Sequence, residues 1–192
     1  MKRSRNLALG LCADHGLSPS TLAVRIAASQ RADPYSVVQT GLAALGGSLH
    51  GGAALAAEDL LREIEAGADA SAVIGKRLRS GERIAGFGHA QHTRGDPRAE
   101  ALLQALHPKF GSSRGLQAAL HVLDVMRSRQ LPGPNIDFAL AALARSAHMI
   151  HGASEGIMAI ARSAGWIAHA LEEYRSPSTF PWQTLYVGPR HG

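Results

Sequence analysis

The chain of 192 residues contains a single cysteine, few aromatic residues and no long apolar run. One cysteine, Cys12, cannot form an intramolecular disulfide or a cysteine-based zinc site, which favours a reduced, cytoplasmic protein. No stretch of 18 apolar residues is present, so we expect no transmembrane helix. The first apolar stretch is short and is interrupted by Asp14 and His15, which argues against a secretory signal.

Dense clusters of charge are also missing, although the formal net charge is +5 and the isoelectric point is near 10.0. The basic residues are scattered, and aromatic residues, at 5%, are too few to form a stacking platform. We therefore expect no nucleic-acid partner. A small polyanionic ligand would make use of the positive charge as well as a nucleic acid would. The glycine-rich segments match neither the P-loop pattern nor a strand-borne dinucleotide fingerprint, so both kinds of nucleotide site are excluded.

Most of the local patterns in the sequence predict helices. Alanine, leucine and glycine supply much of the 45% hydrophobic content, and such small residues favour closely packed helices over a β-sandwich. Ser18 followed by Pro19 is typical of an N-cap and a first helical turn, and Leu22, Ile26 and Ser29 would share one face of that helix. Residues 83–88 are expected to form a short extended connection into a turn, and the tail from 175 is expected to be irregular with one strand at 184–187. The predicted helices cover about residues 19–29, 34–45, 53–65, 69–79, 97–106, 115–129, 135–145 and 156–174.

Three of the ten histidines have unusual neighbours. His15 follows Asp14 in a predicted loop, His50 lies between glycines in GGSLHGGA, and His89 ends the segment IAGFGH. Neighbouring glycines let a ligand approach closely, and a neutral imidazole can polarise a carbonyl group by donating a hydrogen bond. Taken alone, each histidine is more commonly a helix cap or a turn residue.

A carboxylate and two arginines are further candidates. Asp137 lies in the first turn of an apolar helix, where apolar neighbours would raise its pKa toward that of a general base, although such residues ordinarily only oppose the helix dipole. Arg98 in GDPR and Arg162 in MAIARSAGW would suit carboxylate recognition, although both could be ordinary surface residues. His148 and His151, three apart on a predicted helix, could share a metal, but a surface or packing role is more common, and we expect no metal site.

Together these segments resemble the citrate synthase family. The similar stretches, in family order over nearly the whole chain, are ADHGLSPSTLAVRIAAS, LAALGGSLHGGA, GERIAGFGHAQHTRGDPRA, PNIDFALAAL and ARSAGWIAHALEE with LYVGP. The resemblance implies an all-α homodimer that condenses acetyl-CoA with oxaloacetate and needs no tightly bound cofactor. It also implies a large domain, from residues 1–65 and 155–192, and a small domain from residues 66–154.

The resemblance assigns roles to individual residues. His50 matches the histidine that hydrogen-bonds the thioester carbonyl as the enol forms, and Asp137 matches the carboxylate that removes the methyl proton. His89 matches the histidine that helps to activate the oxaloacetate carbonyl. The family positions that bind oxaloacetate are matched by His15, Arg98 and Arg162.

Several departures from the family pattern keep other functions open. The long N-terminal region of the family is missing. The segment FPWQTLYVG also lacks the arginine that, in the family, one subunit of the dimer contributes to the other. Ala90 and His92 replace an arginine and a tyrosine of many relatives, and Ala54 replaces an asparagine. The alternatives are another 2-oxo acid as acceptor, cleavage of a citryl-CoA-like thioester, or a non-catalytic chain that pairs with a separate N-terminal half.

Overall fold

A computed structural model describes residues 2–47, 50–89, 92 and 95–176. Within these residues the chain forms nine helices and no strand, so the all-α prediction is confirmed. The helices are α1 (Lys2–Ala13), α2 (Pro19–Ser29), α3 (Pro34–Leu45), α4 (Gly52–Glu65), α5 (Ala70–Arg79), α6 (Pro97–Phe110), α7 (Arg114–Ser128), α8 (Ile136–Ser146) and α9 (Ala153–Arg175).

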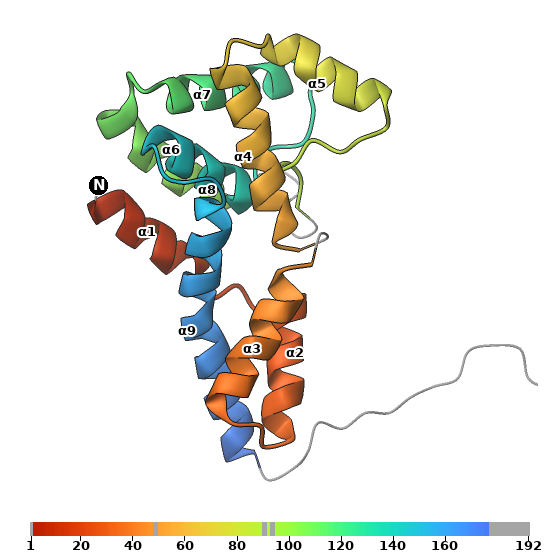
Figure 1. Cartoon of the computed structure of the whole chain (residues 1–192), viewed down its shortest axis with the longest axis vertical. Coiled ribbons are helices and arrows are strands. Elements are labelled where there is room, and N and C mark those ends of the chain that lie inside the picture. Colours follow the sequence, from red (N-terminus) through yellow and green to blue (C-terminus); the bar gives the residue numbers. More distant parts are fainter. Residues whose placement is uncertain (1, 48–49, 90–91, 93–94, 177–192) are drawn as a thin grey trace, which may run out of the picture.

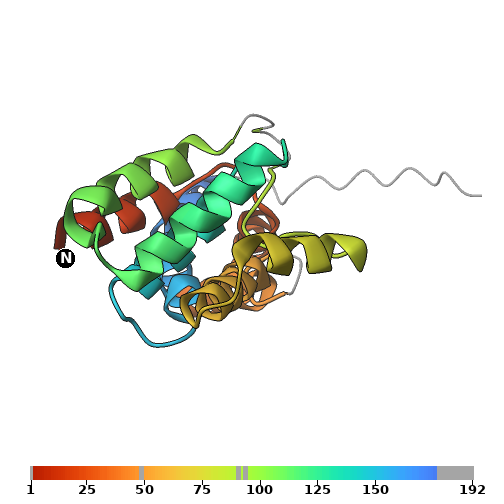
Figure 2. The same cartoon turned by 90° about the horizontal axis from the view of Figure 1, so that it is seen from above.

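The helices surround two central elements, α8 and α9 (Figure 1). Helix α9 packs against α1 on one side and against α2 and α3 on the other, and α2 and α3 form an antiparallel pair beside its C-terminal half. Helix α8 packs against α4, α6, α7 and α9. Seen from above, α6 lies at the edge of the molecule away from α4 and α5, and α7 runs between them and packs against both α4 and α5 (Figure 2). None of the helices in the described ranges is both long and apolar enough to cross a membrane.

Helix α8 is the centre of the hydrophobic core. Nearly all of its residues from Ile136 to Leu143 are buried, because neighbouring helices cover it on every side. Phe138 of α8 and Trp166 of α9 are the largest fully buried side chains among the residues described. A rigid, fully packed helix therefore carries Asp137 in its first turn.

Most predicted helix starts are confirmed by their caps. The Ser18 hydroxyl accepts a hydrogen bond from the backbone N–H of Thr21, and Pro19 begins α2. The carboxylates of Asp33 and Asp69 accept backbone N–H bonds in the same way at the starts of α3 and α5. These local interactions satisfy N–H groups that have no partner within the helix, so the sequence marks each start.

Other expectations were wrong. Helix α1 was not predicted, since it has no capping signal and contains Gly10. On α2, the three residues predicted to share one face differ in burial, because Ser29 is buried and Leu22 is 36% exposed, and the fully buried apolar side chains are those of Val24 and Ala28. Helix α6 continues through Pro108 to Phe110, beyond its predicted end at residue 106. The predicted strand at 184–187 lies outside the described residues.

Helices α1 and α9 approach each other closely at Gly165. A Cβ atom at this position would lie closer to the Ala13 carbonyl oxygen than van der Waals contact allows, and within 3.5 Å of the Asp14 Cα atom. Glycine is therefore required for the close approach. The contact places the end of α1, and with it the segment that carries His15, against the middle of α9.

Candidate active site

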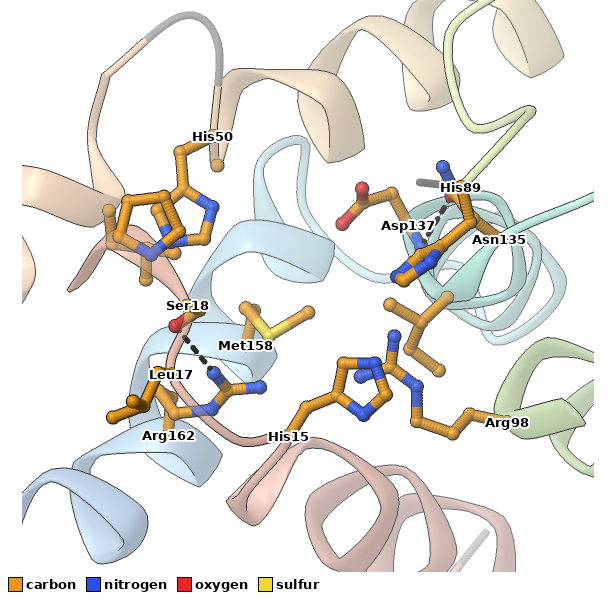
Figure 3. A pocket seen from close by; sticks show the side chains of 14 residues that line it. His15, Leu17, Ser18, His50, His89, Arg98, Asn135, Asp137, Met158 and Arg162 are labelled. Carbon is orange, nitrogen blue, oxygen red and sulfur yellow. Dashed lines mark hydrogen bonds between the residues drawn. The ribbon is translucent and has the colours of Figure 1, made fainter. Parts of the chain in front are cut away.

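One pocket of about 430 Å³ is lined by all the residues that the sequence singled out as catalytic or substrate-binding (Figure 3). They come from distant parts of the chain, so only the tertiary fold brings them together. The residues are His15, His50, His89, Arg98, Asp137 and Arg162.

Helix ends position most of these side chains. His15 follows the last turn of α1, and His50 lies just before α4. Arg98 and Asp137 lie in the first turns of α6 and α8, whereas Arg162 lies in the middle of α9. The pocket therefore faces several helix N-termini, whose partial positive charge favours an anionic ligand.

His50 is held by a buried serine. Its Nε2 atom lies 3.0 Å from the hydroxyl oxygen of Ser20, which is fully buried in the first turn of α2. Burial lowers the pKa of the His50 imidazole, and the positive charge of Arg162 lowers it further. His50 is therefore a neutral, oriented imidazole at neutral pH. Ser20 was not predicted as a site residue, because a serine that follows a proline at a helix start usually contributes only to the stability of that helix.

Asp137 has the perturbed pKa that the sequence suggested. Burial raises the pKa of its carboxyl group from 3.8 to about 6, although Arg98 nearby acts in the opposite direction. Asn135 caps α8 by accepting the backbone N–H of Asp137 at 3.0 Å, which fixes the start of the helix. Figure 3 shows the Asp137 carboxylate pointing toward the side of the pocket where His50 lies. A carboxylate with this pKa is suited to proton abstraction near pH 7.

The Arg98 guanidinium is paired with a buried carboxylate that was not predicted from the sequence. Arg98 donates to both carboxylate oxygens of Asp96, from Nε at 3.0 Å and from Nη2 at 2.7 Å. Asp96 also accepts the backbone N–H of Ile136 at 3.1 Å, so it joins the start of α6 to the start of α8. The pKa of Asp96 is lowered, because these interactions outweigh the opposing effect of burial. Arg98 was predicted as a carboxylate-binding residue, and the carboxylate that it contacts in the structure is that of Asp96, which fixes the orientation of the guanidinium.

Replacing Asp96 with asparagine is expected to destabilise the fold by about 3 kcal/mol at pH 7, because it leaves the Arg98 guanidinium, whose side chain is only 12% exposed, without a counter-charge. Since the folded-state pKa of Asp96 is lowered, its contribution is present above the ordinary aspartate pKa and is lost as the pH falls through the folded value. Urea unfolding at pH 7 and in acid measures both effects. Asp124→Asn is the control, since its pair with Arg127 is exposed. Equal losses in the two variants would contradict this account.

Arg162 ties two segments together at the edge of the pocket. Its side chain is 4% exposed, and it donates from Nε to the Cys12 carbonyl oxygen at 2.8 Å and from Nη1 to the Ser18 hydroxyl at 3.1 Å. Burial lowers the pKa of its guanidinium. Arg162 is thus not an ordinary surface arginine, since it holds the end of α1 against the cap of α2.

Three histidines meet beside the arginines. The rings of His15 and His89 lie 5.5 Å apart between centroids, and His92 lies 5.5 Å from His15 and 4.7 Å from His89. Burial lowers the pKa of both His15 and His89, and the Arg98 charge contributes to each shift. From the sequence, His92 was named only as a departure from the family pattern.

The other proposed histidine pair is arranged differently from the prediction. His148 and His151 lie in the connection between α8 and α9 rather than on a helix, and His148 has a positive φ of 50°. His151 Nε2 contacts the carboxylate of Asp59 at 2.9 Å. The pair therefore does not form the helical i, i+3 arrangement expected for a shared metal.

Comparison with known proteins identifies the family of this chain. The model of the family described as citrate synthase, C-terminal domain, matches residues 2–180. Citrate synthase 2 from Bacillus subtilis is 35% identical over 187 residues, which cover 96% of this chain and 50% of that protein. The structure of citryl-CoA lyase from Hydrogenobacter thermophilus superposes with a TM-score of 0.86 at 26% identity, covering 98% of this chain and 78% of that chain.

A third relative carries ligands. Citrate synthase from Thermoplasma acidophilum, in a ternary complex with carboxymethyl coenzyme A and oxaloacetate, superposes with a TM-score of 0.77 at 29% identity, covering 98% of this chain and 52% of that chain. The present chain spans about half the length of the curated relatives that it matches. With the family model matching most of its length and the helical fold shared with solved members, the chain belongs to the citrate synthase family.

Proposed function

We propose that this chain carries the catalytic residues for condensing acetyl-CoA with oxaloacetate or a related 2-oxo acid through an enol intermediate. The observation that carries the proposal is the pocket itself. It combines a carboxyl group of raised pKa, Asp137, with two imidazoles of lowered pKa, His50 and His89. Groups whose pKa values are shifted in this way are typical of proton-transfer sites.

The first step is removal of a methyl proton from acetyl-CoA. Asp137 takes the proton, and His50 donates a hydrogen bond to the thioester oxygen, which gains negative charge as the enol forms. A Ser20 hydroxyl that donates to Nε2 of His50 leaves the imidazole proton on Nδ1, where it is available to that oxygen. Ser20 is thus a positioning residue for His50.

The second substrate occupies the opposite side of the pocket. Arg98 and Arg162 bind its carboxylates, and His15 and His89 hydrogen-bond its keto oxygen. The nucleophilic enol carbon then attacks the polarised keto carbon to form the new C–C bond. Water cleaves the thioester of the product and releases CoA. Acetyl-CoA is a substrate in this scheme, and no tightly bound cofactor is needed.

We further propose that the working unit is a homodimer or a pair with a separate N-terminal half, and that the chain divides into the domains predicted above. Three large apolar residues along α9 support an additional partner, since Ile160, Ile167 and Leu171 are 70%, 43% and 48% exposed. Sedimentation of the purified chain tests this. A defined dimer supports self-association, whereas aggregation that an added N-terminal half prevents supports the pair.

Cleavage of a citryl-CoA-like thioester is the second candidate. This chain covers 78% of the citryl-CoA lyase from Hydrogenobacter thermophilus, a larger share than the 52% of the citrate synthase from Thermoplasma acidophilum. Cleavage is the reverse of the condensation step, so the same residues serve it: an imidazole accepts the hydroxyl proton, and Asp137 returns a proton to the enol carbon.

Release of free CoA from acetyl-CoA, followed with a thiol reagent in the presence and absence of oxaloacetate, tests the condensation. Cys12 adds little background, because it is fully buried and burial raises the pKa of its thiol to about 11. We expect oxaloacetate-dependent release over many equivalents per chain. No release with acetyl-CoA, combined with formation of acetyl-CoA from citryl-CoA, would instead establish the lyase. No reaction in either direction, with or without an N-terminal half, would contradict both proposals.

A further inference from the structure

Beyond the proposed reaction, we propose that His15, His89 and His92 form a binding site for a divalent transition metal ion of the zinc type. One ring nitrogen from each histidine can be chosen so that all three lie within 4.8 Å of one another. Within the described parts of the chain, this is the one group of potential metal ligands that meets such a criterion. It does not depend on the condensation proposed above, and it departs from our expectation that the chain has no metal site.

Two of the three imidazoles have an unsatisfied nitrogen. The Nε2 atoms of His15 and of His92 are both inaccessible to solvent, and neither has a hydrogen-bond partner among the residues that the structure describes. A buried polar atom without a partner is unfavourable, and such atoms usually mark a missing water or ion. Two of them, on neighbouring rings, point to a ligand that accepts lone pairs from both.

The spacing suits a metal after a small movement. Zinc binds imidazole nitrogens at roughly 2.0–2.1 Å, so tetrahedral ligands lie about 3.3 Å apart. The histidine nitrogens lie within 4.8 Å of one another, so they would move together by up to about 1.5 Å on binding. His89 and His92 both belong to the connection between α5 and α6.

The charge around the site also permits a cation. Arg98 is a fixed positive charge that acts on both His15 and His89. Its guanidinium is neutralised by the bidentate pair with Asp96, whose carboxylate is fully buried. The positive charge of Arg98 is therefore balanced locally before an ion binds. Three imidazoles leave a fourth coordination position for water or for a carboxylate oxygen.

Titration of the full chain, purified without a histidine tag and freed of metal by a chelator, tests the site. Zn²⁺ is added in a calorimeter, and Co²⁺ is added while the visible absorption typical of tetrahedral coordination is recorded. We expect one ion per chain in both titrations. His92→Phe removes one ligand and leaves His15 and His89 in place, and we expect it to weaken binding at least about tenfold.

A matched control separates this site from general metal binding by histidines. His121 is exposed on α7, and His121→Phe is expected to bind both ions like the natural chain. Circular dichroism establishes that both variants keep their helical content. The proposal is overturned if the natural chain binds no ion, or if His92→Phe and His121→Phe bind equally well.

An ion at this site would also affect catalysis, and this part alone rests on the proposed function. His15 and His89 would serve both the metal and the 2-oxo acid, so saturating Zn²⁺ is expected to slow CoA release in the natural chain and a chelator to restore it. His92→Phe is expected to resist this inhibition. Binding without inhibition would leave the metal site intact and would instead count against the roles of His15 and His89 in the reaction.

Discussion

Replacing Asp137 with asparagine is expected to lower the rate of oxaloacetate-dependent CoA release by about 10²–10⁴-fold, which is the usual contribution of a positioned general base. Asparagine has almost the same shape but cannot accept the methyl proton. For the same reason, the rate in the natural chain is expected to rise as the pH passes about 6, because the Asp137 carboxyl group ionises in that range. Initial rates measured across this range for both proteins check the two expectations.

The same variant is expected to be more stable than the natural chain. The folded-state pKa of Asp137 is raised, so the folded chain holds its proton more tightly than the unfolded chain does. Stability is therefore lost as the pH rises from about 4 to about 6, and the cost at pH 7 is up to about 3 kcal/mol. The asparagine of the variant cannot ionise and avoids this cost, so urea unfolding at pH 7 should show a gain.

Opposite changes in activity and stability distinguish a catalytic carboxylate from a structural one. Asp124→Asn, which alters an exposed carboxylate on α7, is expected to change neither. An Asp137→Asn protein that retains full activity would remove Asp137 from the mechanism. A variant that loses both activity and stability would instead mean that the carboxylate holds the helix start in place.

The second large effect is expected at the contact between α1 and α9. Gly165→Ala would place a methyl group against the Ala13 carbonyl and force the two helices apart, at a cost of about 3 kcal/mol. The movement would also displace His15 and break the hydrogen bond from Arg162 to Cys12. We therefore expect both a lower unfolding free energy and weaker binding of the 2-oxo acid, measured by urea titration and by the KM for oxaloacetate.

A glycine on the same helix supplies the control for this variant. Gly156 lies near the start of α9, and a Cβ atom there would meet no atom of the described part of the chain within 4 Å. Gly156→Ala is expected to stabilise the chain by up to about 1 kcal/mol, because alanine favours the helix. If both alanine variants behave alike, helix propensity rather than the close approach controls the effect at Gly165.

Local features of the sequence were sufficient to predict much of the helical structure. The N-cap of α2 at Ser18 and that of α3 at Asp33 act through hydrogen bonds to residues two or three positions away, so they can be recognised without the fold. Helix α1 lacks such a signal and is held by its packing against α9, α6 and α8, so it was missed. The exposed side chain of Leu22 likewise reflects tertiary packing rather than helical periodicity.

The sequence by itself determined the fold class, most helix starts and the identity of six candidate residues, because these depend on local hydrogen bonding, on composition and on similarity to a family. Only the tertiary structure decided how those residues are held. Ser20, Asp96 and His92 contact residues 30 or more positions away in the chain, so no local pattern identifies them. They matter because they are in or beside buried parts of the fold. There, a charge or polar atom without a partner costs folding free energy, so each such group needs a particular partner.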